Sequence, residues 1–116
     1  DYLYGGAGAD TLVGGMGDDT MAGANGDDLF LFDFCSGHDV VDGGGGSWTD
    51  TVDLSNLVAQ GATVDVTSGG HTWTLDANSV GDTLTLGNNQ AGEILVHNPD
   101  NTTEQISFTN IEAVKY

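Results

Sequence analysis

A glycine-rich repeat of nine residues sets the strongest constraint on how this chain folds. Three units follow one another without a spacer at residues 5–13, 14–22 and 23–31, and residues 1–4 have the form of the end of a preceding unit. The units follow the pattern Gly-Gly-x-Gly-x-Asp-x-U-x, where U is a large apolar residue, except that the third unit has Ala24 at its second position. Glycine adopts positive φ angles at little steric cost, so the glycines predict a tight turn, and the last four residues predict a short strand with U facing inward. The inward column is expected to contain Leu3, Leu12, Met21 and Phe30.

The aspartate at the sixth position of each unit points to a hard cation. The turn directs several carbonyl oxygens toward one place, and the aspartate adds a carboxylate at the end of the turn. Calcium takes about six to eight oxygen ligands at roughly 2.3–2.6 Å, from carboxylates and backbone carbonyls. One turn does not supply that many oxygens, whereas two stacked turns do. The repeat therefore predicts a ladder of turns with Ca²⁺ ions held between its rungs.

The ladder is expected to continue beyond the strict repeats and to end near Ser55. Asp39 and Asp50 each lie eleven residues after the preceding ladder aspartate, and Val41 and Val52 extend the apolar column. A loop absorbs the two extra residues of each longer unit. The predicted metal-binding residues are Asp1, Gly5, Gly6, Gly8, Asp10, Gly14, Gly15, Gly17, Asp19, Gly23, Asn25, Gly26, Asp28, Asp39 and Asp50.

This array resembles the RTX (repeats-in-toxin) calcium-binding nonapeptide repeats. The resemblance implies an all-β fold, in which a right-handed parallel β-roll is followed by a β-rich carboxy-terminal cap. In such a roll successive units lie on opposite sides, so that ions sit between alternate units. The implied pairs, which give up to four Ca²⁺ sites, are Asp1 with Asp19, Asp19 with Asp39, Asp10 with Asp28, and Asp28 with Asp50. Asp18 and Asp27, at the variable position before a ladder aspartate, are expected to face solvent.

The resemblance also implies where the protein acts. RTX proteins of this type leave Gram-negative bacteria by type I secretion with an uncleaved carboxy-terminal signal, so we expect a secreted, extracellular protein that contacts the type I secretion machinery. Extracellular calcium modules with Kd of roughly 10⁻⁴ to 10⁻³ M are empty in the cytosol and filled outside. Because the chain starts within a repeat and has no initiator Met, we expect a carboxy-terminal piece of a longer protein, with upstream domains as partners.

The charge balance favours a metal as the counter-ion. The chain has 18 acidic residues against the single Lys115, a formal net charge of -17. This charge repels phosphate backbones and anionic lipid surfaces, so neither nucleic-acid binding nor membrane insertion is expected. The ladder carboxylates lie closer together than the ~8 Å Debye length at physiological salt, so their repulsion is only partly screened. Without calcium, we expect residues 1–55 to be largely disordered.

The composition changes after Ser55, where glycine becomes rarer and Thr, Val, Leu and Asn dominate. The expected domains are therefore a calcium-binding roll at residues 1–55 and a β-rich cap at residues 56–116. Alternating residues in the cap predict no helix and five strands, at 62–68, 72–76, 82–86, 92–97 and 105–108. The phrase Phe108-Thr109-Asn110-Ile111-Glu112 resembles the end of many RTX carboxy-terminal domains. Because an open strand edge invites pairing with other chains, we expect the cap to cover the end of the roll.

Three functions remain open for such a chain. The first is a non-enzymatic calcium-binding module that folds after secretion and stabilises or presents upstream domains. The second is a module that binds a polysaccharide or cell-surface ligand through exposed Trp48 or Trp73. The third is an accessory to an upstream secreted protease, lipase or alginate epimerase. An enzyme is not expected, because no catalytic motif is recognisable and Cys35 and His38 have no orienting third group nearby.

Overall fold

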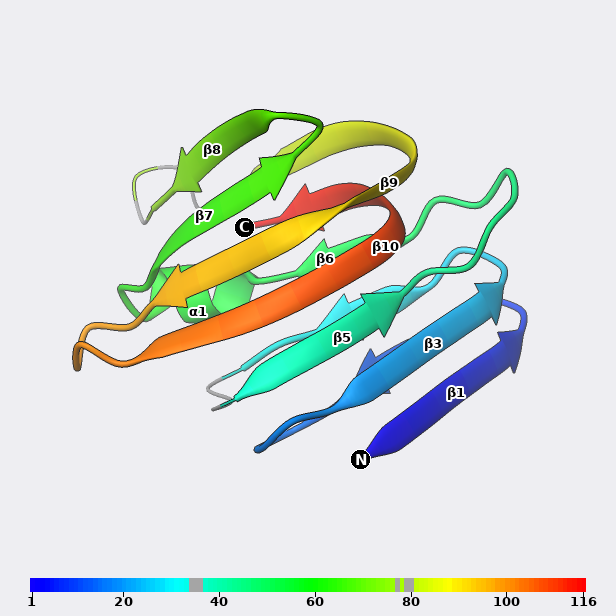
Figure 1. Ribbon diagram of the computed structural model, residues 1–116, viewed down its shortest axis with the longest axis horizontal. Coiled ribbons are helices and arrows are strands. Elements are labelled where there is room, and N and C mark those ends of the chain that lie inside the picture. Colours follow the sequence, from blue (N-terminus) through cyan, green and yellow to red (C-terminus); the bar gives the residue numbers. More distant parts are fainter. Residues whose placement is uncertain (34–36, 77, 79–80) are drawn as a thin grey trace.

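The computed structural model of the chain describes residues 1–33, 37–76, 78 and 81–116. Its strands form one mixed, ten-stranded sheet that folds back on itself into two layers, in agreement with the predicted all-β class (Figure 1). In chain order the elements are β1 (Tyr2–Ala7), β2 (Thr11–Val13), β3 (Thr20–Asn25), β4 (Leu29–Leu31), β5 (His38–Asp42), β6 (Thr51–Asp53), α1 (Ser55–Ala59), β7 (Thr63–Ser68), β8 (His71–Leu75), β9 (Thr83–His97) and β10 (Thr103–Lys115).

Alternate repeat units are hydrogen-bonded neighbours. β1, β3 and β5 pair in parallel in one layer, and β2, β4 and β6 pair in parallel in the other. Each unit contributes one strand, and its glycine-rich turn carries the chain across to the opposite layer. A strand therefore meets the strand two units away, which is the adjacency of alternate units that the repeat predicts.

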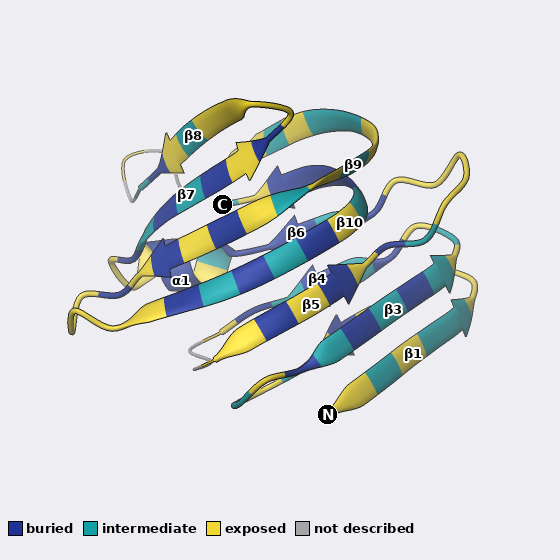
Figure 2. Cartoon of the chain, viewed as in Figure 1, coloured by how far each residue is buried: buried dark blue, intermediate teal, exposed yellow. Residues whose placement is uncertain are grey.

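The register of these strands aligns the apolar residues of the repeats into two columns. The paired positions are Leu3, Met21 and Val41 in one layer and Leu12, Phe30 and Val52 in the other. All of them are buried except Leu3, which is half-buried against the same core. Figure 2 shows buried residues alternating with exposed residues along β5, and with half-buried residues along β3. The predicted inward orientation of these residues is confirmed, but they form two columns, one in each layer, and not a single column.

The long strand β10 joins the two layers where the repeats end. Residues 105–109 of β10 pair in parallel with β5, and residues 113–115 pair in parallel with β6. Phe108 therefore continues the column of Val41, and Val114 continues the column of Val52. β9 runs antiparallel along β10, and β7 pairs with β9 in turn (Figure 1). The open edges of β5 and β6 are thereby covered, as expected for a cap.

The prediction that the cap contains no helix is wrong. α1 (Ser55–Ala59) follows β6 directly, and its Leu57 and Val58 are buried in the core. A helix of five residues is too short to show a periodic apolar pattern in the sequence. Packing of its two buried side chains against the core stabilises it instead.

Two of the five predicted cap strands are parts of one longer strand. β9 (Thr83–His97) contains both the 82–86 and the 92–97 segments, and β10 extends well beyond the predicted 105–108. The intervening residues Gly87-Asn88-Asn89-Gln90-Ala91 have the composition of a loop. Asn89 has a φ of 51°, and the pairing of β9 with β10 contains two irregularities in register. Both strands bend between the layers and yet remain paired, which composition does not reveal.

Candidate metal centre

The ladder aspartates are linked to one another through backbone hydrogen bonds. In each pair, Oδ1 of the later aspartate accepts a hydrogen bond from the backbone N–H of the aspartate two units earlier. The N···O distances are 2.9 Å from Asp10 to Asp28, 2.9 Å from Asp19 to Asp39, and 2.8 Å from Asp28 to Asp50. At the start of the chain, the amino group of Asp1 lies 2.7 Å from Asp19 Oδ1. The structure thus brings together all four predicted aspartate pairs.

Four ladder aspartates have a second carboxylate oxygen that is buried without a partner among the described residues. Within the described part of the chain, Oδ2 of Asp10, Asp19, Asp28 and Asp50 makes no hydrogen bond. Asp19 and Asp28 are 2% exposed and Asp50 is fully buried. An uncompensated buried carboxylate costs several kcal/mol, and a cation beside it removes that cost. These oxygens therefore fit the Ca²⁺ ions that the repeat predicts.

The site does not consist of a cluster of acidic side chains. Among the residues that the structure describes, no group of three or more His, Cys, Asp or Glu side chains is placed to hold a metal ion. A Ca²⁺ ion in the ladder would therefore take most of its ligands from backbone carbonyls, with one or two carboxylates. This agrees with the role that the sequence assigns to the glycine-rich turns, while the individual ligand assignments stay predictions.

The first glycine of each unit makes room for the ladder aspartate. A Cβ on Gly14 would lie 2.7 Å from Asp19 Oδ2, and a Cβ on Gly5 would lie 2.8 Å from Asp10 Oδ2. Gly23 is crowded in the same way by Asp28. None of these three glycines has a positive φ. The sequence pattern predicts that the geometry of the turn requires glycine at this position, and that reason is wrong. Glycine is needed there because a carboxylate approaches the backbone closely.

The other predicted glycines hold the turns as expected. Positive φ angles between 93° and 124° occur at Gly6, Gly8, Gly15, Gly17 and Gly26. Ala24 replaces the second glycine of its unit and still has a φ of 83°. Asn25 ends β3, and its carbonyl oxygen accepts a hydrogen bond of 2.8 Å from Gly8 N, which ties the first turn to the third.

Burial changes the proton affinity of two ladder aspartates. Desolvation raises the pKa of Asp28 above its ordinary value and raises the pKa of Asp50 to about 7. For Asp50, the hydrogen bond from the Asp28 backbone opposes this increase, and the negative charges of Glu112 and Asp28 add to it. At neutral pH the Asp50 end of the ladder therefore favours the uptake of a proton or a cation.

Glu112 of β10 takes the place of the next ladder aspartate, and sequence reasoning missed it. Its Oε2 accepts a hydrogen bond of 2.8 Å from Asp50 N, and its Oε1 accepts one of 2.7 Å from Asn89 N. Both of its oxygens are therefore paired, unlike those of the aspartates. Glu112 lies 62 residues after Asp50, so the repeat spacing does not reveal it. The only signal is the Asn110-Ile111-Glu112 phrase itself.

Asp18 and Asp27 do more than face solvent. Both are exposed, but Asp18 Oδ1 accepts a hydrogen bond of 2.9 Å from His38 N, and Asp27 Oδ1 accepts one of 2.8 Å from Thr49 N. They face solvent as predicted, and the two hydrogen bonds are an additional role that the repeat pattern does not reveal. These carboxylates tie the strict nonapeptide turns to the longer units that stack on them.

Comparison with known families identifies the repeat. Residues 1–30 match the model of the RTX calcium-binding nonapeptide repeat, in four copies. The amino-terminal part of this chain therefore consists of RTX repeats, a calcium-binding module typical of type I secreted proteins. Comparisons with curated proteins and with solved structures gave no significant match.

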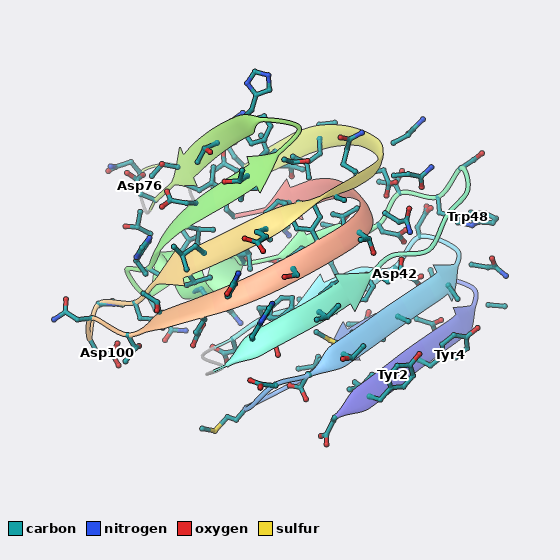
Figure 3. The ribbon with its side chains drawn as sticks, in the orientation of Figure 1. Tyr2, Tyr4, Asp42, Trp48, Asp76 and Asp100 are labelled. Carbon is teal, nitrogen blue, oxygen red and sulfur yellow. The ribbon has the colours of Figure 1, made fainter. Side chains whose placement is uncertain are left out.

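The remaining candidates lie outside the ladder. His38 Nε2 forms a hydrogen bond of 2.8 Å with Ser107 Oγ, and Cys35 lies outside the described residues. Trp48, in the loop before β6, is 40% exposed, whereas Trp73 is half-buried against the core (Figure 3). In the described ranges, no helix has the length and apolar character needed to cross a membrane.

Proposed function

We propose that this chain is a calcium-triggered folding module of a larger secreted protein. In this proposal residues 1–55 form a right-handed parallel β-roll when Ca²⁺ binds, and residues 56–116 cap it. The observation that supports it most directly is the set of four buried Oδ2 oxygens without partners among the described residues. Three of them, on Asp10, Asp19 and Asp28, lie in the segment that consists of RTX repeats. The module has no catalytic role of its own.

The chain's own residues explain why folding would depend on calcium. The ladder buries the carboxylates of Asp28 and Asp50, whose Oδ1 accepts a backbone N–H and whose Oδ2 has no partner within the described residues. Its glycine-rich turns also lose more conformational entropy on ordering than other sequences do. Ca²⁺ supplies the missing positive charge when it is bound. A ligand that binds only the folded state adds about 2.7 kcal/mol per independent site at 100 times its Kd. Several sites together are then sufficient to decide between the unfolded and the folded ladder.

The coupling of folding to calcium binding also supports an extracellular location for the folded module. A ladder with millimolar affinity stays unfolded at cytosolic calcium concentrations, passes through the type I secretion machinery of a Gram-negative bacterium as an unfolded chain, and folds outside. The folded module then stabilises or presents domains that lie upstream of it.

A calcium titration of this 116-residue chain tests the proposal. We expect a cooperative gain of β signal in far-ultraviolet circular dichroism at sub-millimolar to millimolar Ca²⁺, with several ions per chain in calorimetry. Mg²⁺ should act weakly, because it requires a smaller octahedral site and keeps its waters. Asp19→Asn should weaken the transition, since it removes the orphaned carboxylate oxygen and keeps an acceptor for the amino group of Asp1. A chain that is equally folded in chelator would contradict the proposal.

A second candidate function is the binding of a polysaccharide through exposed aromatic side chains. Tyr2 and Tyr4 project from the same face of β1 and are 71% and 65% exposed, and Trp48 is also exposed (Figure 3). Such rings stack on sugar rings. Quenching of Trp48 fluorescence by acidic and neutral polysaccharides, with Trp48→Phe as the control, tests this candidate, and the absence of any response in the calcium-loaded chain counts against it.

A further inference from the structure

We propose one additional cation site, at the junction between the last glycine turn (residues 43–50) and the bend of β10 at Asn110–Glu112. This inference rests on the proposed function, because it extends the same ladder by one rung. The site was not expected from the repeats, since half of it is built by the cap.

The bend of β10 occupies the position of the next turn in the stack. Thr109 pairs with Asp42, and Gly43 N donates a hydrogen bond of 3.0 Å to Thr109 O. At the other side of the bend, Glu112 N donates one of 3.1 Å to Asp50 O. Asn110 therefore stands where the first glycine of a further unit would stand, and Glu112 stands where its aspartate would stand.

The oxygens around Gly43 repeat an arrangement found inside the ladder. A Cβ on Gly43 would lie 2.6 Å from Asp50 Oδ2 and would collide with the carbonyl oxygen of Asn110. A Cβ on Gly5 would lie 2.8 Å from Asp10 Oδ2 and 3.0 Å from Gly23 O, which belongs to the turn stacked on it. At both places, an aspartate oxygen without a partner among the described residues and a carbonyl oxygen of the following turn lie on either side of the first glycine of the unit.

The charges at the junction require a counter-ion. Asp50 is fully buried, its Oδ1 accepts the Asp28 amide, and its Oδ2 has no partner within the described residues. Glu112 adds a second buried carboxylate, although its oxygens are already paired with amides. Lys115, the only Lys or Arg of the chain, is exposed. A hard divalent cation fits this mixture of carboxylate and carbonyl oxygens, with water completing its coordination.

This site would tie calcium occupancy to the cap. Asp50 Oδ2 comes from the last turn of the ladder and Asn110 O from β10, the strand that pairs with both layers. An ion between these two oxygens would hold the cap against the stack. The cap would then dock most firmly on a loaded ladder.

Ion counting by native mass spectrometry tests the site in the 116-residue chain at saturating Ca²⁺. Asp50→Asn removes the charge and keeps an oxygen for the Asp28 amide, and Gly43→Ala fills the space between Asp50 Oδ2 and Asn110 O at constant charge. Asp53→Asn is the matched control, because Asp53 is a buried carboxylate in β6 whose Oδ1 accepts hydrogen bonds from Ser55 N and Oγ. Counts are taken from the compact charge states alone, so partial unfolding of a variant does not enter them.

We expect Asp50→Asn and Gly43→Ala each to bind one ion fewer than the unmodified chain, and Asp53→Asn to bind the full number. In a Trp73→Phe background, the calcium response of Trp48, which lies in the 43–50 turn, should shrink in Asp50→Asn. Full ion counts in both junction variants would overturn this site and leave the proposed function intact. An unmodified chain that binds no calcium overturns both.

Discussion

Buried carboxylates are treated differently in the repeats and in the cap. Glu112, which belongs to the cap, has both oxygens bonded to backbone amides, from Asp50 and Asn89. Asp28 and Asp50 of the ladder each use Oδ1 in this way, and their Oδ2 is buried without a partner in the described structure. The buried charge of Glu112 is therefore satisfied within the protein, whereas the described repeats leave buried carboxylate oxygens without partners, where the proposed function places a cation.

The two regions also differ in their apolar cores. Each repeat unit buries one large apolar side chain, such as Met21 or Phe30. Three strands of the cap, β7, β9 and β10, bury two or more apolar side chains each, among them Val64, Val66, Ile94, Val96, Ile106 and Phe108. Because burial of apolar area is the main favourable term in folding, the cap has much more stability of its own per residue. The comparison teaches that one continuous sheet contains a part with an extensive apolar core and a part with much less apolar packing, which under the proposed function depends on metal.

Removal of calcium should produce the largest effect and should separate the two regions. In chelator, amides of residues 1–53 should exchange with solvent near the rate of an unfolded chain, while β7, β9 and the first half of β10 should keep protection. Each ion lost costs about 2.7 kcal/mol at 100 times its Kd, so the loss of several exceeds the stability of a small domain. Hydrogen exchange with mass spectrometry measures both regions in one sample. Equal protection in calcium and in chelator would break the comparison.

A pair of core substitutions sharpens this contrast. Phe30 and Phe108 are both buried in apolar columns. Phe30 lies beside Val52 within the repeats, and Phe108 of β10 lies beside Val41. Phe108→Ala should cost about 3–5 kcal/mol whether or not calcium is present, whereas Phe30→Ala should cost a similar amount only in calcium. The reason is that the repeats, which contain Phe30, are expected to be unfolded in chelator, so the substitution has no folded structure to destabilise. Urea unfolding under both conditions provides the measurement, and a large loss for Phe30→Ala in chelator contradicts the expectation.

A glycine substitution tests why the ladder needs glycine at the first position of a unit. Gly23→Ala places a methyl group against Asp28 Oδ2, so we expect a loss of about 1–3 kcal/mol from overpacking and a weaker calcium transition. Gly45→Ala is the control, because a Cβ there meets no atom within 4 Å and its φ is not positive. That variant should stay within about 0.5 kcal/mol of the unmodified chain. Equal calcium midpoints for the two variants would contradict the explanation that Gly23 is needed because Asp28 Oδ2 lies close to its backbone.

The sequence predicts the repeats far better than the cap. The nonapeptide period places Asp10, Asp19 and Asp28 in equivalent positions, and the alternation of layers follows from the family resemblance, so all four aspartate pairs are predicted correctly. The same period gives the wrong reason for glycine at Gly5, Gly14 and Gly23. A sequence pattern does not distinguish a position that needs a positive φ angle from one where a Cβ atom would collide with a neighbour. The outer hydrogen bonds of Asp18 and Asp27 are also invisible in the pattern, since their partners lie in units of different length.

The cap is less predictable because its contacts are distant in sequence. Ser55–Ala59 is too short for a periodic signal, and the bend of β9 at Asn89 has the composition of a loop. The pairing of β10 with β5 and β6 depends on register across more than 60 residues, which no local pattern specifies. The role of Glu112 follows from that register, and for this reason only the structure reveals it.

Acid should have a moderate effect on the repeats and little on the cap. Because the pKa of Asp50 in the folded chain is about 7 and that of an ordinary aspartate is 3.8, the metal-free folded state binds more protons than the unfolded state between these values. Its stability therefore increases as pH falls through about 7 toward 3.8. Protons compete with Ca²⁺ for the same carboxylate, so the apparent affinity of an ion at Asp50 should fall about tenfold from pH 8 to pH 6. Calorimetric titration at both values measures it, and Asp50→Asn should abolish that component.

The smallest predicted effect concerns the hydrogen bond that connects a strict repeat to a longer unit. Asp27→Ala removes the acceptor for Thr49 N and should cost about 0.5–1.5 kcal/mol in calcium, because the bond is exposed to solvent. Asp27→Asn keeps an oxygen at the same place and should recover most of that loss. The measurement is the urea midpoint of the calcium-loaded chain. If both variants behave alike, the charge of Asp27 matters and its hydrogen bond does not, and the longer units are then held in register by their ladder aspartates alone.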